Sequence, residues 1–125
     1  MSWQGYVETL MATKSLTACG IFGHDGSVWA TSQGFPMTAE SIRQVVSSTL
    51  DSSKAASGVT VGNERYILVR GDPGVSVVLK KGQSGIVACR SAQCCIIALH
   101  DQTIKSEIAL THVGKIIDYL TKHGY

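Results

Sequence analysis

Both ends of the chain carry apolar residues at helical spacing. The first run occupies positions i, i+3, i+4, i+7 and i+8 of an amphipathic helix, with Trp3, Tyr6, Val7, Leu10 and Met11. Ser2 stands where an N-cap is expected. The last helix is predicted from a second stripe, and Gly124 stands just beyond it, where a glycine commonly ends a helix. That second stripe consists of Ala109, Val113, Ile116, Ile117 and Leu120.

The middle of the chain alternates between short β-rich runs and tight turns. The stretch ACGIFGHDGSVWATS predicts two strands around His24-Asp25-Gly26, whose Asp-Gly pair favours a hairpin turn. Five further runs follow after residue 58: VTV, RYILVR, VSVVLKK, IVACRS and CCIIALH. The turns between them are too short for the crossovers that parallel strands need, so we expect an antiparallel meander.

One more helix is predicted between the two groups of strands. It begins after the N-cap Thr38, and its apolar face consists of Ile42, Val45, Val46 and Leu50. The order is then helix, two strands, helix, about five strands and helix. This order predicts a single α+β domain over residues 1–125, in which helices cover an antiparallel sheet.

Several aromatic residues stand where a core does not require them. Trp29 alternates with Val28 and Ala30, so it is predicted to project from the other face of its strand, among hydroxyl groups. Tyr119 lies about 120° from the centre of the last helix's stripe, at ~100° per residue. Tyr125 is the last residue of the sequence.

Two interpretations of these rings stay open on pattern alone. The rings seal the seam between the two terminal helices, or they form an aromatic groove. Such grooves bind proline-rich segments in the polyproline II form, whose free carbonyls suit Trp N–H and Tyr O–H donors. The residues concerned are Trp3, Tyr6, Trp29, Tyr119 and Tyr125.

Charge and hydropathy narrow the classes of partner. Eleven Lys and Arg against nine Asp and Glu give a net charge of +2, which does not support a strongly basic nucleic-acid-binding protein. No apolar run approaches the roughly 18–20 residues that span a bilayer. The start of the sequence also lacks the charged and apolar segments of a secretory signal. We therefore expect a cytoplasmic protein without a nucleic-acid partner.

No catalytic, metal or cofactor site is predicted. The cysteines show no C-x-x-C or zinc spacing, and we expect buried free thiols, with a redox or metal role as the alternative. Cys94 and Cys95 should point to opposite faces of a strand. Surface positions are expected for His24, His100, His112 and His123, which lack metal-ligand spacing. Nucleophile-elbow, Walker A and G-x-G-x-x-G motifs are absent from the sequence.

Four blocks of the sequence resemble the profilin family. MSWQGYV is similar to the family's N-terminus, and DGSVWATSQGF is similar to the stretch around its second tryptophan. GDPG with KKGQSGIV resembles the turn and basic loop of short profilins, and KIIDYLTKHGY resembles their C-terminal helix. The resemblance implies a mostly antiparallel sheet of six to seven strands. It also implies that the N- and C-terminal helices lie on one face and shorter helices on the other.

The resemblance implies binding without catalysis. The expected partners are monomeric actin, proline-rich proteins such as formins, and phosphoinositide headgroups at a membrane surface, in a cytoskeleton-associated protein that regulates actin polymerisation. The family's proline-groove positions fall on the five aromatic residues given above. Its actin-binding positions fall on Arg70, Lys80, Lys81, Arg90 and Lys115. Headgroup binding is expected from Lys80, Lys81 and Arg90, as cations near one loop.

A sensor domain of the PAS or longin type is the alternative function. Such domains also wrap helices around a small antiparallel sheet, but bind a small molecule inside or a trafficking partner. A surface groove that contains Trp3 and Trp29 predicts a change of tryptophan fluorescence when poly-L-proline is added. An interior sensor site predicts no change.

Overall fold

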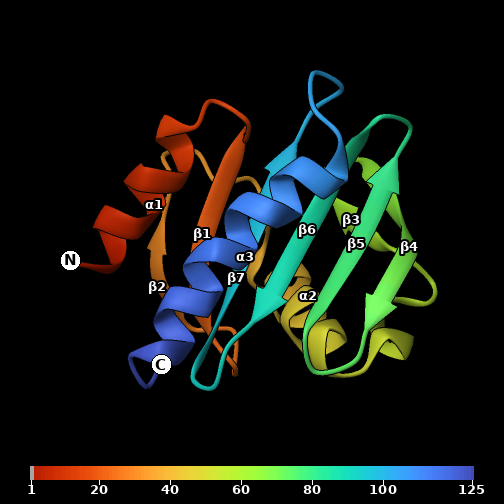
Figure 1. The fold of residues 1–125 in the computed structure, drawn as a ribbon. Helices are drawn as coiled ribbons and strands as arrows, with labels where there is room; N and C mark the ends of the chain where they lie inside the picture. The colour runs from red at the N-terminus through yellow and green to blue at the C-terminus, as the bar shows by residue number, and fades with distance from the viewer. Residues whose placement is uncertain (1) are drawn as a thin grey trace.

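The computed structural model describes residues 2–125, which form a seven-stranded sheet with helices on both faces (Figure 1). The helices are α1 (Trp3–Ala12), α2 (Ala39–Leu50), the short 3₁₀ helix η1 (Ser52–Ala55) and α3 (Ser106–Lys122). The strands are β1 (Ala18–Gly23), β2 (Val28–Thr31), β3 (Val59–Val61), β4 (Glu64–Asp72), β5 (Ser76–Lys81), β6 (Ser84–Arg90) and β7 (Cys94–His100).

The sheet has the order β2-β1-β7-β6-β5-β4-β3, and all its neighbouring strands are antiparallel. Strands β3 to β7 follow one another as the predicted meander. The early hairpin then joins through β1, which pairs with β7 from Ala18↔Leu99 to Gly23↔Cys94. The α+β fold predicted from the sequence is confirmed, including α1 and α3 on one face and α2 on the other (Figure 1).

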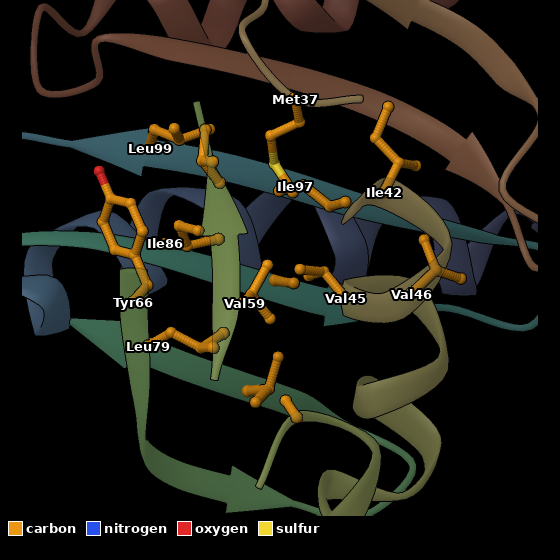
Figure 2. Close-up of a cluster of buried hydrophobic side chains, with 14 of the residues drawn as sticks. Met37, Ile42, Val45, Val46, Val59, Tyr66, Leu79, Ile86, Ile97 and Leu99 are labelled. Atoms are coloured by element: carbon orange, nitrogen blue, oxygen red, sulfur yellow. The ribbon is translucent and has the colours of Figure 1, made fainter. Parts of the chain in front are cut away.

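Each face of the sheet is buried in its own cluster of apolar side chains. The alternation along β7 sends Cys94 and Ile96 toward α1 and α3, and sends Cys95 and Ile97 toward α2. Figure 2 shows the α2 side, where Ile97 lies among side chains from α2 and the neighbouring strands. The two adjacent cysteines therefore point to opposite faces, as predicted.

Local signals in the sequence determine where the helices begin and end. The Ser2 hydroxyl accepts a hydrogen bond from the Gly5 N–H at 3.1 Å, and Thr38 accepts one from the Ser41 N–H at 3.2 Å. Gly124 has a φ of +86° just past α3, a conformation that glycine adopts without strain. These are the caps that the sequence predicts.

Leu50 was predicted to lie on the buried face of α2, and this is wrong. Its side chain is 56% exposed, whereas the neighbouring Thr49 is buried. Leu50 is the last residue of α2, and the chain turns into η1 two residues later. The core below the end of this helix is therefore closed by Thr49.

Trp29 also departs from the predicted strand alternation. Ile21 pairs with Ala30 and Phe22 pairs with Val28, so Trp29 is an extra residue in β2 without a partner on β1. This bulge lets Trp29 and Ala30 both pack on the α1 side, although adjacent strand residues normally point to opposite faces. Val28 is left exposed. The bulge therefore turns the indole toward α1.

The four cysteines are free and buried. Burial raises the pKa of the Cys19 and Cys89 thiols to about 12, and it also raises the pKa of Cys94 and Cys95. Because the thiolate is the reactive form, we expect the native protein to react slowly with a disulfide reagent such as DTNB at pH 8. The four thiols should react within minutes once guanidinium unfolds the chain. Fast labelling of the native protein would contradict this burial.

Candidate functional site

The aromatic residues of α1, β2 and the C-terminal end of the chain form one connected cluster. The Trp3 ring lies 4.8 Å from that of Trp29, 5.9 Å from Tyr6 and 5.2 Å from Tyr125, measured between ring centroids. Tyr6 in turn lies 6.0 Å from Tyr119. The structure thus brings together all five aromatic residues that the sequence predicts, with Trp3 at the centre.

The cluster is open to solvent along one side. A hollow of about 440 Å³ is lined by Ser2, Trp3, Tyr6, Tyr119, His123 and Tyr125, and we call it the aromatic groove. Tyr119 is 47% exposed and Tyr125 is 43% exposed, while Trp3 and Tyr6 are half-buried. Trp29 does not line the groove but supports Trp3 from β2. The rings therefore seal the seam between α1 and α3 and also present a surface.

The Tyr125 ring is placed by hydrogen bonds of its own backbone. After Gly124 the chain folds back, and the Tyr125 N–H donates to the Leu120 carbonyl at 2.9 Å. The main-chain oxygen of Tyr125 accepts from Ser91 Oγ at 2.8 Å and from the Gln93 N–H at 2.5 Å. These bonds hold the last residue against the turn between β6 and β7. The groove is therefore largely formed before a ligand arrives.

The hydroxyl of Tyr6 is a hydrogen-bond donor at neutral pH. Burial, followed by the neighbouring Tyr119 and Tyr125, raises the pKa of Tyr6 above its ordinary value. Tyrosine hydroxyls and the Trp indole N–H suit ligands that offer carbonyl oxygens. The chemistry of the groove is thus apolar ring faces with donor groups at their edges.

Sequence reasoning missed two residues that line the groove, Ser2 and His123. Ser2 was predicted only as the cap of α1. His123 follows Tyr119 by four residues, and its ring stacks on the Tyr119 ring with centroids 4.2 Å apart. The i to i+4 spacing from an aromatic residue was a signal that could have placed His123 on this face.

Two of the predicted actin-binding residues come together away from the groove. Arg70 on β4 and Lys80 on β5 border a small hollow of about 90 Å³ at the start of α3. The other residues that line this hollow are Val69, Val78, Ser106, Glu107 and Leu110. Ile67 and Val69 of β4 are each 61% exposed. Exposed apolar side chains bordered by charges are typical of protein interaction surfaces.

The structure does not bring the other predicted cations to this place. Lys81 forms an ion pair with Glu64 at 3.0 Å. The Arg90 guanidinium donates to Thr49 Oγ1 at 3.3 Å, so it points toward α2. Lys81 and Arg90 also stand at opposite ends of the β5–β6 hairpin, since Lys81 pairs with Ser84 and Arg90 ends β6. Lys80, Lys81 and Arg90 therefore do not gather at one loop.

Lys115 does not border the hollow between the start of α3, Arg70 and Lys80. It borders an open hollow of about 370 Å³ next to the aromatic groove, lined by Tyr6, Thr9, Lys115, Ile116 and Tyr119. Both hollows share Tyr6 and Tyr119. The five cations predicted to bind actin therefore do not form one continuous patch.

His100 was expected at the surface, and this is wrong. It is the last residue of β7 and is 2% exposed. Its Nε2 lies 2.7 Å from Ser106 Oγ and its Nδ1 lies 2.9 Å from the Asp101 main-chain oxygen. Nε2 thus links the end of β7 to the start of α3, while Nδ1 is bonded to the residue that follows β7.

Within residues 2–125, no helix combines the length and apolar character that crossing a membrane requires. Across the same residues, no group of three or more His, Cys, Asp or Glu side chains is arranged to hold a metal ion.

Comparison with known proteins points to one family. The family model of profilin matches residues 1–125. The chain is 35% identical to a profilin of Drosophila melanogaster over 127 residues, which covers all of both chains. It superimposes on the crystal structure of Acanthamoeba castellanii profilin II with a TM-score of 0.90 and 32% identity, covering 99% of this chain and 100% of that one.

A more distant structure shares the fold. Mouse profilin IIa, solved in complex with a double repeat from the FH1 domain of mDia1, has a TM-score of 0.79 and 18% identity. Each chain is covered completely. At this identity the likeness concerns the fold alone.

Proposed function

We propose that this chain, which belongs to the profilin family, binds monomeric actin on one surface and proline-rich ligands in the aromatic groove. Profilins are non-enzymatic actin-binding proteins, and we extend this absence of catalysis to the present chain. We further infer that it acts in the cytoplasm, where it regulates actin polymerisation. Family membership sets aside the alternative of a PAS- or longin-type sensor.

The observation that carries the proline-binding part is the convergence of rings from both ends of the chain. A polyproline II helix has three residues per turn and no internal hydrogen bonds, so its carbonyls are free to accept. Proline rings can lie against Trp3 and Tyr6 while the indole N–H and tyrosine hydroxyls donate to those carbonyls. We expect modest affinity, on the order of micromolar to sub-millimolar, because a small groove makes few hydrogen bonds.

The surface around Arg70 and Lys80 supports the actin-binding part. Helix α3 packs on β6 and β7, and it separates this surface from α1 and the aromatic groove (Figure 1). Cations beside exposed apolar residues would steer and orient an acidic partner. Two separate sites allow a ternary complex, in which a proline-rich partner such as a formin receives the bound actin monomer.

Charge reversal at this surface tests the actin-binding part. We expect Arg70→Glu with Lys80→Glu to weaken actin binding at least about tenfold, because like charges across an interface are strongly unfavourable. Affinity for a decaproline peptide should stay within twofold of the unchanged protein. Inhibition of spontaneous assembly of pyrene-labelled actin measures the first quantity, and calorimetric titration measures the second.

Lys81→Glu is the matched control, because it also reverses a charge at the end of β5 but at an exposed ion pair with Glu64, outside the hollow that Arg70 and Lys80 border. Such pairs contribute about 0.2–1 kcal/mol to stability. We expect this variant to inhibit actin assembly nearly as well as the unchanged protein. Unaltered inhibition by the double variant would show that actin binds elsewhere, and loss of both activities would indicate misfolding.

Phosphoinositide binding stays a prediction from the resemblance. Lys80 is half-buried, Lys81 has an acidic partner and Arg90 points toward α2. The geometry gives less support to this activity than to the other two.

A further inference from the structure

We propose that His123 sets the pH dependence and part of the ligand choice of the aromatic groove. In its protonated form it donates a hydrogen bond to a proline-rich ligand, and in its neutral form it favours a ligand that supplies an N–H group there. The proposal rests on the proposed binding of proline-rich ligands in this groove.

The hydrogen bonding of His123 determines which nitrogen carries the proton. Nδ1 lies 2.8 Å from the main-chain oxygen of Tyr119. A carbonyl oxygen can only accept, so Nδ1 must carry the hydrogen in this contact. In the neutral ring, Nε2 then holds a lone pair and no hydrogen. Because Nδ1 is used in this contact with α3, Nε2 is the ring nitrogen that is left for a ligand, and His123 is one of the residues that line the groove.

Proline-rich ligands respond to this arrangement in a specific way. A proline residue has a carbonyl acceptor but no N–H donor. Neutral His123 therefore offers only an acceptor at Nε2, and the proline-rich ligand also offers only acceptors. No hydrogen bond can form between them. Protonation places a hydrogen on Nε2 and makes it a charge-assisted donor. The ring of His123 stands just beyond the last turn of α3 and stacks on the Tyr119 ring.

Among the residues that line the groove, His123 alone carries an imidazole, and the other ionisable side chains there are tyrosines. Tyr6, Tyr119 and Tyr125 line it with His123, and a phenol is a far weaker acid than an imidazolium. Lys122 precedes His123 and is an exposed cation in the last turn of α3. His24 is connected to the groove only through Ser91. Its Nε2 lies 3.0 Å from the Ser91 main-chain oxygen, and Ser91 Oγ donates to the main-chain oxygen of Tyr125. No carboxylate side chain is among the residues that line the groove.

The test is the dissociation constant of decaproline, measured by tryptophan fluorescence at pH 6.0 and pH 8.0. We expect the unchanged protein to bind about fivefold more tightly at pH 6.0, as a hydrogen bond to a charged group predicts. His123→Gln cannot change its charge, so its two constants should agree within about 1.5-fold. His112→Gln, which alters a histidine bonded to Ser15 outside the groove, should keep the full pH effect.

A glycine scan of the same peptide tests the ligand choice. Each proline is replaced in turn by glycine, which adds one N–H donor, and binding is measured at pH 8.0. For each glycine peptide, its affinity is divided by the affinity of decaproline for the same protein. At one position of the peptide this ratio should be higher for the unchanged protein than for His123→Gln.

Equal affinity at the two pH values in the unchanged protein would overturn the proposal. It would also be overturned by a pH effect that persists in His123→Gln, or by identical glycine ratios in both proteins. If decaproline fails to bind at either pH, the proposed proline-binding function itself is wrong. That outcome differs from tight binding that does not depend on pH.

Discussion

Trp3→Ala is expected to lower the affinity for decaproline by at least about thirtyfold, the loss typical of a central aromatic residue in an interface. Trp3 is in ring contact with Tyr6, Trp29 and Tyr125, so its removal takes away a binding face and the support of its neighbours. Isothermal titration calorimetry measures the effect without relying on the indole that has been removed.

Trp3→Phe is the graded control for this prediction. It keeps an aromatic ring but lacks the indole N–H, so its affinity should lie between those of the unchanged protein and Trp3→Ala. Circular dichroism should show that both variants keep the fold. Affinity within twofold of the unchanged protein in Trp3→Ala would end the assignment of this groove.

Leu10→Ala is expected to lower the free energy of unfolding by about 2–5 kcal/mol, the cost of a large-to-small change in a packed core. Leu10 is 2% exposed and belongs to the apolar cluster that joins α1 to the sheet. A loss of this size approaches the total stability of many domains. The groove should also weaken, since α1 carries Trp3 and Tyr6.

Leu50→Ala is the matched control, with the same chemical change at an exposed position of α2. It should change the free energy of unfolding by no more than about 0.5 kcal/mol. Urea denaturation followed by circular dichroism measures both variants. Equal losses would mean that the burial of Leu10 does not contribute to stability as described.

Local sequence signals predicted most of the fold. The caps Ser2 and Thr38, the helical stripes and the short turns each act within a few residues, so a pattern along the chain contains them. The place of β1 beside β7 depends on pairing between residues more than 70 positions apart, as between Phe22 and Cys95. Such pairing leaves no local mark, and the order of the sheet could not be derived from pattern alone.

The bulge in β2 shows where pattern reasoning failed on a single residue. Strict alternation assigns Trp29 to the face opposite Ala30, but one inserted residue brings both to the α1 side. Nothing in SVWATS distinguishes a regular strand from a bulged one. Trp29 was still singled out with the other four aromatic residues, because alternation placed it away from Val28 and Ala30, and the resemblance to profilins then assigned the set to a groove.

The basic residues show a signal that was present but not used. Lys80 and Lys81 are adjacent in one strand, so period-two alternation already separates their side chains onto opposite faces. The same argument separates Arg90 from Cys89, whose side chain points toward α3. The prediction of one cluster assumed that cations on neighbouring segments of the sequence also lie close together in space.

The central claim is that the two ends of the chain form one exposed proline-binding groove, separate from the surface around Arg70 and Lys80. A ¹⁵N–¹H NMR titration with decaproline tests it most directly. We expect the indole N–H signals of Trp3 and Trp29 and the backbone signals of Tyr6, Tyr119 and Tyr125 to shift together with one dissociation constant, while those of β4 and β5 stay in place. Shifts centred on β4 and β5, or none in the aromatic groove at millimolar peptide, would contradict the account.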